Sequence, residues 1–355
     1  MDTRYSRQTS LKEFGPEGQS KLLNSKVLVV GLGGLGIPVL QYLNAMGIGF
    51  LGLMDQDVVE LHNLQRQVLY TEKDVGRLKL EAAHEKLSAQ NSKTDFGLHD
   101  TFLTKDNALD IIKNYDVVVD ATDNFQTRYL INDACIILNK PFVYGALHGF
   151  EGHVSVFNHK NGPTYRCLYP NMPSPEEVPN CNENGVLGVL PGIIGTLQAL
   201  ETVKLIAGVG EVLSGSLLVY DGLSQRSTKI KFNAQLPNTE ITELKETYQI
   251  DNCEIVSTVS AETFLELREA KAALVLLDVR TKEEFDNDHL QEAINTPLDV
   301  LQLPGHLSQT HQDIYIICQS GKRSAVATKK LQIDYPRLKF HDVLGGMNKL
   351  MTLSS

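Results

Sequence analysis

The sequence predicts an α/β protein built from a doubly wound, largely parallel sheet followed by a second, smaller α/β domain. Three features support this fold class. Apolar runs alternate with helical periodicity over residues 26–148, and a second alternation covers 261–331. The residues between them, 233–253, are polar and aperiodic. Alternating strands and helices are typical of parallel sheets with helical crossovers. The expected boundaries are 1–235 for the first domain, 236–253 for the linker and 254–355 for the second domain.

Each element of the first domain follows from its local pattern. Short apolar runs predict strands at 26–30, 50–55, 115–120, 141–144, 216–220 and 227–232. Helical spacing of apolar residues predicts helices at 37–46, from an N-cap at Asp74 through 87, after 120 through 138, and at 192–207. Gly208 is the stop signal of the last helix, since glycine adopts the left-handed conformation at little cost.

The second domain repeats this alternation on a smaller scale. The pattern predicts helices at 261–270, at 282–286 and up to 331, with strands at 273–278 and 313–318. About a hundred residues are enough for an independent α/β domain.

Length and composition limit the function classes. The chain has 355 residues, enough for two hydrophobic cores, and no stretch of about 18 consecutive apolar residues that would predict a membrane-spanning helix. Its N-terminus lacks the apolar region of a secretory signal. Five scattered cysteines make no disulfide framework, so we expect a cytoplasmic protein. A formal charge of −10 argues against nucleic acid or an anionic membrane as a partner.

A glycine cluster marks a nucleotide site. Gly31, Gly33, Gly34 and Gly36 stand where the first strand passes into the first helix, and Asp55 ends the next strand. Such glycines allow a tight turn and close approach of a phosphate, which the helix N-terminus attracts, while the carboxylate suits a ribose hydroxyl. By itself this pattern favours an NAD-dependent enzyme.

The residues after the second strand argue against NAD. They form a dense polar set that hydride transfer does not need. Its members are Asp57, Glu60, His62, Asn63, Gln65, Arg66, Gln67, Lys79, Asp120, Asp123 and Asn124. Phosphoryl and nucleotidyl transfer use such residues, because Arg and Lys neutralise a triphosphate while a carboxylate holds Mg²⁺.

These residues carry a family resemblance. The motifs are Arg4-Tyr-Ser-Arg7-Gln8, Gly31 to Gly36, Asp55 to Gln67, Lys79, Asp123-Asn124 and Cys181-Asn-Glu-Asn-Gly185-Val. The stretch from Arg4 to about Phe232 resembles the adenylyltransferases of ubiquitin-like sulfur carriers. These are the molybdopterin-synthase and thiazole-biosynthesis adenylyltransferases (the HesA/MoeB/ThiF family), relatives of ubiquitin-activating enzymes. The resemblance implies a Rossmann-like adenylation domain.

The resemblance also implies roles for individual residues. Lys79 and Arg66 would contact the phosphates of ATP, and Asp123 would bind Mg²⁺. Arg7 would reach into the site of a neighbouring subunit, which implies a homodimer. The implied nucleotide-binding set is Arg7, Gly31, Gly33, Gly34, Gly36, Asp55, Asp57, His62, Asn63, Leu64, Gln65, Arg66, Lys79, Asp123 and Asn124.

Two cysteine features of this family can be compared with the present sequence. Many members bind structural zinc through two Cys-x-x-Cys pairs, but here the first pair reads Thr164-Tyr-Arg-Cys167 and no cysteine stands near Pro237. Four tetrahedral ligands cannot be assembled, so we predict no zinc and expect packing alone to hold the fold there. Cys181 lies in an Asn-, Pro- and Gly-rich stretch. In the thiazole branch a cysteine here bonds to the carrier, and the alternative is an incidental thiol.

A second chemistry stands near the C-terminus. Cys318 follows an apolar run and precedes Gln319-Ser-Gly321-Lys322-Arg323-Ser324 and a helical pattern. A cysteine, a short glycine-containing loop and a helix start form an anion-binding cradle whose N–H groups and helix dipole favour the thiolate. The loop therefore indicates sulfur or phosphate chemistry. A cysteine phosphatase is the main alternative. Phosphatase loops usually place five residues between the cysteine and the arginine, enough to wrap a phosphate. Only four residues separate Cys318 from Arg323, and this smaller loop suits sulfur.

The segment from 254 to 355 resembles a single rhodanese domain. The motifs in order are Leu276 to Arg280, Glu283 to Phe285, His289-Leu290, Ala293 to Pro297 and the Cys318 loop. The resemblance implies a persulfide on Cys318, with Lys322 and Arg323 nearby. We expect Asp278 and Arg280 to form a structural ion pair and His289 to be a core or capping residue.

Together the two halves predict a mechanism. The first domain would adenylate the C-terminal glycine of a small ubiquitin-like carrier ending in Gly-Gly, and the Cys318 persulfide would displace AMP. Cleavage of the acyl disulfide, by Cys181 in our hypothesis, would release carrier thiocarboxylate for thiamin, molybdopterin or a thiolated nucleoside. The sulfur donor would be a cysteine desulfurase or thiosulfate. An NAD-linked oxidoreductase fused to a sulfurtransferase, or a non-catalytic carrier-docking scaffold, are the alternatives.

Overall fold

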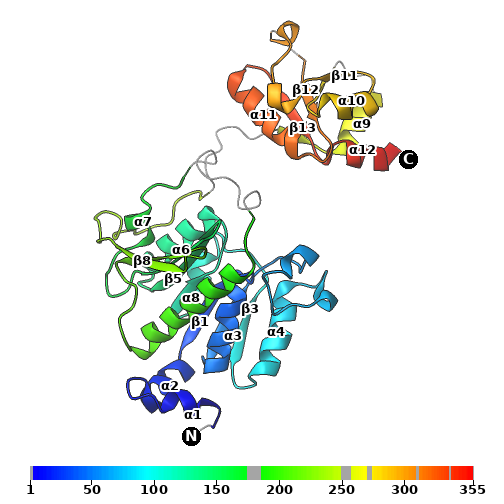
Figure 1. Ribbon diagram of the computed structural model, residues 1–355. Helices are drawn as coiled ribbons and strands as arrows, with labels where there is room; N and C mark the ends of the chain where they lie inside the picture. Colours follow the sequence, from blue (N-terminus) through cyan, green and yellow to red (C-terminus); the bar gives the residue numbers. More distant parts are fainter. Residues whose placement is uncertain are drawn as a thin grey trace. The chain divides into compact units, whose positions relative to one another are not determined.

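The computed structural model describes residues 3–173, 185–248, 257–269, 274–308, 312–335 and 337–354. The chain divides into two compact units between Ile250 and Asp251 (Figure 1). Each unit has its own sheet and its own hydrophobic clusters.

The first unit is built on an eight-stranded sheet in the order β3-β2-β1-β4-β5-β6-β7-β8. The strands β3, β2, β1, β4 and β5 run parallel, and β6, β7 and β8 add on as antiparallel neighbours. Their bounds are β1 Lys26–Val30, β2 Phe50–Met54, β3 Asp95–His99, β4 Val117–Asp120, β5 Phe142–His148, β6 Glu151–Phe157, β7 Ser216–Asp221 and β8 Arg226–Lys231.

The register of the central strands positions the site. Val30 at the end of β1 stands opposite Met54 of β2 and opposite Asp120 of β4. The carboxyl ends of these three strands therefore meet at one edge of the sheet, where ligands bind in open α/β folds. All of β4 is buried, as is β1 after its first residue, which explains why uninterrupted apolar runs revealed them.

Helices cover both faces of this sheet. The bounds are α1 Ser6–Thr9, α2 Gly15–Leu23, α3 Gly36–Met46, α4 Lys79–Gln90, α5 Ala108–Ile112, α6 Phe125–Ile137, α7 Tyr165–Leu168 and α8 Val189–Ala207, with short 3-10 turns η1 Thr3–Tyr5, η2 Leu61–Asn63 and η3 Glu72–Asp74. Residues of α3 and α8 share one hydrophobic cluster, and residues of α5 and α6 belong to the other. In Figure 1, α3 and α8 lie in front of the strands. Gly208 ends α8 in the left-handed conformation, as the sequence predicts.

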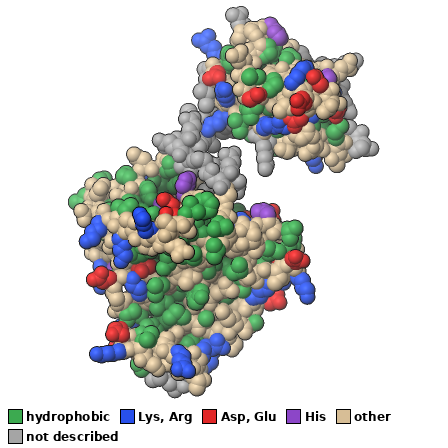
Figure 2. Space-filling view, viewed as in Figure 1, with side chains coloured by type: hydrophobic (Ala, Val, Ile, Leu, Met, Phe, Trp, Pro, Cys, Tyr) green, Lys and Arg blue, Asp and Glu red, His purple; other side chains and the backbone are tan. Residues whose placement is uncertain are grey.

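Helix α8 is a special case. It has 19 residues and a mean hydropathy of 1.3, so by length and composition alone it could cross a membrane. Here it packs as a core helix, with Ile194 and Ala199 buried, and the buried Gln198 amide donates to the carbonyl of Asp120 at 2.7 Å. Figure 2 shows hydrophobic side chains gathered over α8 on the visible face. Val189, the first residue of α8, is 63% exposed.

The expected helix start at Asp74 is wrong. Helix α4 begins at Lys79, and Asp74 closes the 3-10 turn η3 instead. Residues after Asp74 pair with an earlier segment, since Val59 N–H donates to the carbonyl of Arg77 and Lys79 N–H to that of Asp57. This tertiary pairing keeps the chain extended before α4 and delivers Lys79 to the first turn of the helix.

The second unit is a five-stranded parallel sheet in the order β11-β10-β12-β13-β9, with separate hydrophobic clusters on its two faces. The strands are β9 Ser257–Val259, β10 Val275–Asp278, β11 Ala293–Asn295, β12 Ile314–Ile317 and β13 Phe340–Val343. The helices are α9 Ala261–Glu269, α10 Lys282–Asn287, α11 Lys322–Asp334 and α12 Gly346–Ser354, with 3-10 turns η4 Leu298–Val300 and η5 Gly305–Leu307.

The expected linker begins as part of the first unit. In its described portion, up to residue 248, Tyr248 is buried and its hydroxyl donates to Asp133 at 2.7 Å. Asp133 also accepts two hydrogen bonds of 2.7 Å from Arg166. This buried carboxylate ties the segment after β8 to α6 and α7.

Candidate functional site

A cavity of about 870 Å³ opens where the central strands of the first unit end. It collects residues from the glycine turn, the segment after β2, the start of α4 and the segment after β4. The predicted site residues that line it are Gly31, Gly33, Gly34, Asp55, Asp57, His62, Asn63, Arg66, Lys79, Asp123 and Asn124. Residues from Gly31 to Asn124 thus meet, because parallel strands end at the same edge.

The glycine turn is shaped by close backbone contacts. Gly31 has a φ of +97°, and a Cβ there would lie 2.8 Å from the carbonyl oxygen of Ala121. A Cβ on Gly36 would lie 1.9 Å from the carbonyl oxygen of Gly31. Gly36 does not line the cavity, so its role is to let α3 start directly against the turn.

The Asp55 carboxylate organises the same turn. It accepts hydrogen bonds from Leu32 N–H at 2.7 Å and from Asp57 N–H at 2.8 Å. Burial raises the pKa of Asp55, while Lys79 and these N–H groups oppose the rise. The carboxylate thereby links the end of β2 to the glycine turn and still lines the cavity.

Two of the cations that the sequence predicts for the site, Lys79 and Arg66, line this cavity. Lys79 is 6% exposed, and its ammonium group pairs with Asp57 at 2.9 Å. Arg66 donates from Nη1 to the carbonyl of His62 at 3.1 Å. A buried lysine whose partner carboxylate is itself half exposed is suited to neutralise an incoming polyanion.

The segment after β4 supplies the acidic side. Asp123 and Asn124 line the cavity, and the Asn124 side chain caps α6 by accepting from Thr127 N–H at 2.9 Å. Asp120 is fully buried and accepts from the hydroxyl and N–H of Thr122. Within the described residues, no group of three or more His, Cys, Asp or Glu is arranged to hold a metal ion.

The sequence reasoning missed part of the cavity wall. Arg128 of α6 lines it, is 7% exposed, and lies over the rings of Phe125 and Tyr144 at 5.4 and 5.5 Å. The remaining residues of this wall include His148, His153, Tyr165 and Tyr169. The position of Arg128, one helical turn after Asn124, was the available signal. These residues come from β5, β6, α7 and its C-cap, so no local pattern connects them.

Some predicted residues lie elsewhere. Leu64 packs against the hydrophobic cluster, and the carbonyl of Gln65 lies against Gly188, so neither lines the cavity. Arg7 on α1 is exposed and does not line the cavity of its own chain. Cys181 falls outside the described residues.

Hydrogen bonds link the residues that stand where many family members have their zinc-binding cysteine pairs. Gln235 N–H donates to the sulfur of Cys167 at 3.3 Å, and Thr164 donates to the carbonyl of Asn238 at 2.9 Å. Thr164 and Cys167 stand at the first of the family's cysteine pairs, and Gln235 and Asn238 stand near Pro237, where the second pair would fall. Hydrogen bonds therefore contribute to holding the chain here, in addition to the packing that the sequence predicts.

The second candidate site lies at the end of β12. Cys318 is buried, and its sulfur accepts from Gly321 N–H at 3.2 Å and contacts the Ser324 hydroxyl at 3.4 Å. Gly321 adopts a φ of +89° and caps α11. The loop therefore turns a backbone N–H group and a helix start toward the sulfur, an arrangement suited to binding an anion there.

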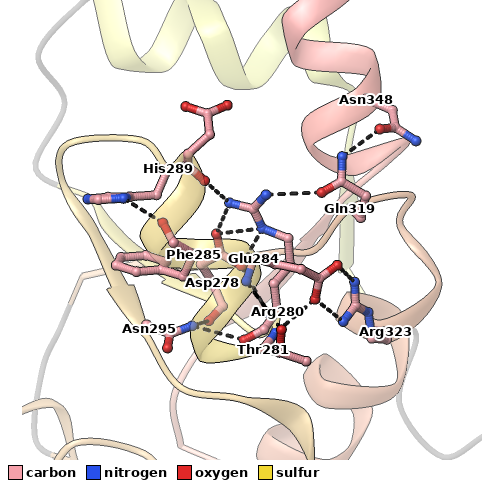
Figure 3. Close-up of polar contacts among 11 residues, drawn as sticks. Asp278, Arg280, Thr281, Glu284, Phe285, His289, Asn295, Gln319, Arg323 and Asn348 are labelled. Carbon is pink, nitrogen blue, oxygen red and sulfur yellow. Dashed lines mark hydrogen bonds and ion pairs between the residues drawn. The ribbon is translucent and has the colours of Figure 1, made fainter.

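Arg280 fixes the base of this loop. It forms a buried pair with Asp278 at 2.7 Å and donates to the Gln319 side chain at 3.0 Å, as Figure 3 shows. Gln319 in turn donates to Asn348 of α12 at 2.6 Å. The expected structural pair of Asp278 and Arg280 is confirmed. His289 stacks on Phe285 and hydrogen bonds to its carbonyl at 2.8 Å, so it is a capping residue.

Arg323 forms an ion pair that the sequence analysis did not predict. Its two terminal nitrogens donate to both carboxylate oxygens of Glu284 at 2.6 and 2.7 Å, which places the guanidinium against α10 (Figure 3). The hydrogen bonds from Arg323 lower the pKa of Glu284 to about 2. The sequence motif did not reveal this partner.

The fold and the two sites define a class: a nucleotide-binding α/β domain joined to a domain with a cysteine-centred anion loop. A family model described as the ThiF family matches residues 5–241, and one described as a rhodanese-like domain matches residues 260–352. The chain therefore belongs to the ThiF family and carries a C-terminal rhodanese-like domain.

Two relatives carry names that combine an adenylyltransferase with a sulfurtransferase. The adenylyltransferase and sulfurtransferase MOCS3 of Culex quinquefasciatus is 41% identical, covering 97% of this chain and 86% of that protein. The protein of the same name from Drosophila yakuba is 40% identical, covering 97% and 82%. Among solved structures, E. coli MccB with ATP has a TM-score of 0.59 at 22% identity, covering 68% of this chain and 74% of that one. That likeness concerns the fold.

Proposed function

We propose that this protein adenylates the C-terminal glycine of a small ubiquitin-like sulfur carrier and then transfers sulfur to it from Cys318. The observation that carries this proposal is the meeting of Lys79, Arg66 and Asp123 around one cavity, on a chain that also holds the Cys318 loop. Membership of the ThiF family and the rhodanese-like domain support the same pair of activities.

The cavity has the residues that ATP requires. The glycine turn allows close approach of the nucleotide, Asp55 can accept from a ribose hydroxyl, and Lys79 and Arg66 would neutralise the phosphates. Asp123 would supply one oxygen ligand to Mg²⁺, which usually takes its other ligands from phosphates and water. Lys79 would exchange Asp57 for the phosphates when the nucleotide enters.

The adenylation step needs alignment more than proton transfer. A C-terminal carboxylate is ionised at neutral pH, so it can attack the α-phosphorus without a general base. The bond to pyrophosphate breaks as the bond to the carboxylate oxygen forms. The enzyme contributes the positioned cations that stabilise the departing pyrophosphate.

Sulfur transfer follows at the activated carbonyl. The terminal sulfur of a Cys318 persulfide attacks the acyl-adenylate, a C–S bond forms, and AMP leaves with the electrons of the C–O bond. The product is an acyl disulfide between carrier and Cys318. Attack by the Cys181 thiolate on the Cys318 sulfur would release carrier thiocarboxylate and leave a Cys181–Cys318 disulfide for an external thiol to reduce.

The proposal includes a homodimer in the cytoplasm. Arg7 is exposed on α1, away from the cavity lining of its own chain, which supports a role in a partner's site. Exposed Val189 and Leu200 on α8 offer an apolar surface for self-association. The sulfur donor is a cysteine desulfurase or thiosulfate, and we propose that no zinc is bound.

The decisive experiment combines nucleotide exchange with intact mass. The protein with MgATP and each Gly-Gly-ending ubiquitin-fold protein of its own cell should exchange pyrophosphate into ATP with one of them. With a sulfur source added, that carrier should exchange one oxygen for sulfur. Lys79→Met should lower exchange at least about 100-fold, while Lys73→Met, an exposed neighbour, should not. Absence of exchange with every carrier would refute the proposal.

Mixing two inactive variants tests the dimer. Arg7→Ala and Lys79→Met would each lack exchange alone. If Arg7 serves the partner's site, a mixed dimer contains one intact site, so exchange should return on mixing. Lack of recovery, with dimers demonstrated by light scattering, would contradict this role for Arg7.

A further inference from the structure

The mouth of the Cys318 loop is held by an ion pair between two elements. Glu284 comes from α10 and Arg323 from the first turn of α11, and they join through two parallel hydrogen bonds of 2.6 and 2.7 Å (Figure 3). Bidentate pairs of this kind combine charge neutralisation with fixed orientation. Both side chains are about one third exposed, so an incoming molecule can meet them.

The two arginines described near the loop are both paired with carboxylates. Arg280 is paired with the buried Asp278, and Arg323 with Glu284, so each described arginine of the loop region has its own carboxylate. The hydrogen bonds from Arg323 hold the pKa of Glu284 at about 2, so this acid stays ionised at neutral pH. A small dianion that approaches Cys318 would therefore meet an Arg323 guanidinium whose charge Glu284 already neutralises.

Sulfur donors differ in charge. Thiosulfate carries two negative charges, and transfer to the Cys318 thiolate forms a persulfide and releases sulfite. A cysteine persulfide carries at most one negative charge, and transfer of its outer sulfur releases a thiolate. Because Glu284 neutralises Arg323, the guanidinium attracts both donors less. The loss is greater for thiosulfate than for a persulfide, since Coulomb attraction scales with the charge of the donor.

We propose that Glu284 is a specificity-determining residue for the sulfur donor: by neutralising Arg323 it selects against thiosulfate-like dianions and in favour of a persulfide donor. The inference rests on the proposed function of Cys318 and adds the residue that decides which donor charges it. Glu284 acts through Arg323, so it is a positioning residue and not a catalytic one.

The variant Glu284→Gln tests this cleanly. Glu284 also completes a capping box with Thr281, accepting from Thr281 N–H at 3.0 Å. Glutamine can keep that hydrogen bond while losing the charge. Glu283→Gln is the matched control, since Glu283 is the exposed neighbour on the same helix and its change alters net charge equally. Glu284→Asp keeps the charge and should behave more like the natural protein.

Sulfur transfer to cyanide from two donors provides the measurement. Thiosulfate is a dianion, and methanethiosulfonate is a monoanion that releases methanesulfinate in the same reaction. Glu284→Gln should raise kcat/KM for thiosulfate about fivefold or more, mainly through KM, and raise it less for methanethiosulfonate. Adding Arg323→Gln should cancel the gain. Glu283→Gln should stay within about twofold of the natural protein.

The outcomes separate this inference from the function beneath it. Unchanged or lower kcat/KM for thiosulfate in a folded Glu284→Gln protein would overturn the role of Glu284, as would equal gains with both donors. Loss of all transfer in Cys318→Ala, with pyrophosphate exchange intact, is expected from the proposed function. Transfer that survives Cys318→Ala would instead overturn the function of Cys318 itself.

Discussion

At the scale of single residues, backbone contacts decide which glycines matter. Gly36 does not line the cavity, yet a Cβ there would lie 1.9 Å from the carbonyl oxygen of Gly31. The backbone atom it would meet cannot move without displacing the turn that Asp55 holds. The glycine pattern thus encodes packing of helix on turn as well as room for phosphate.

Gly36→Ala should therefore destabilise the first unit by at least about 2 kcal/mol, because overpacking against backbone cannot be relieved by a rotamer change. Urea unfolding would measure it. The control is Gly192→Ala in α8, where nothing lies within 4 Å of the added Cβ and helix propensity should make the change neutral or slightly stabilising. Equal stability of the two variants would contradict the assigned contact.

Asp74 provides a prediction about pH. Burial opposes its charge, but hydrogen bonds from Lys86 and Thr71 outweigh burial and lower the pKa to about 2. A carboxyl whose pKa falls on folding contributes stability that is present above its unfolded pKa of 3.8 and is lost as pH falls toward 2. Asp74→Asn should thus destabilise the protein at pH 7, with a difference that shrinks below about pH 4. Urea titrations across this range, with exposed Glu72→Gln as the control, would check the slope.

At the scale of elements, one buried carboxylate joins three segments. Asp133 of α6 binds Arg166 of α7 and Tyr248 beyond β8, and Arg166 also lies 4.6 Å from the ring centre of Tyr129. The charges are satisfied by direct hydrogen bonds, as buried ions require. The network explains how the start of the expected linker stays on the first unit.

Tyr248→Phe should cost about 1.5 kcal/mol, since it removes one hydrogen bond to a charged acceptor and leaves the ring in place. Asp133→Ala should cost about 3–5 kcal/mol, because Arg166 would remain buried without its partner. Chemical unfolding would measure the loss in free energy of unfolding for each variant. Tyr42→Phe, a control at an exposed position, should lose almost none. If Tyr248→Phe were as stable as the natural protein, the Tyr248–Asp133 hydrogen bond would not stabilise the fold.

At the scale of the whole molecule, the chain consists of two units with separate cores. We therefore expect each of the two units to be stable alone. Residues 251–355 produced by themselves should unfold in one cooperative urea transition and transfer sulfur from a donor to cyanide through Cys318. Phe264, fully buried in its core, supplies the control: Phe264→Ala should lower the midpoint. A fragment without a cooperative transition would show that the first unit is needed for its stability.

Much of the fold was predictable because buried parallel strands read as apolar runs. Strands β1, β4, β10 and β12 were found this way. The sequence reasoning missed β3, whose residues are partly exposed, and β9 and β11, which have three residues each. It also missed β6 and β13, although most of their residues are buried. Such segments become strands through their neighbours in the sheet, and their own sequences carry little of that information.

The sequence by itself determined the two chemistries, because glycines, carboxylates, cations and a loop cysteine must stand at set distances from strand and helix ends. Only the tertiary structure decided the partners: Lys79 with Asp57, Asp133 with Tyr248, and Glu284 with Arg323. The physical reason is that backbone periodicity and turn chemistry are local, whereas a hydrogen bond between distant residues exists only after strand order and register bring their elements together.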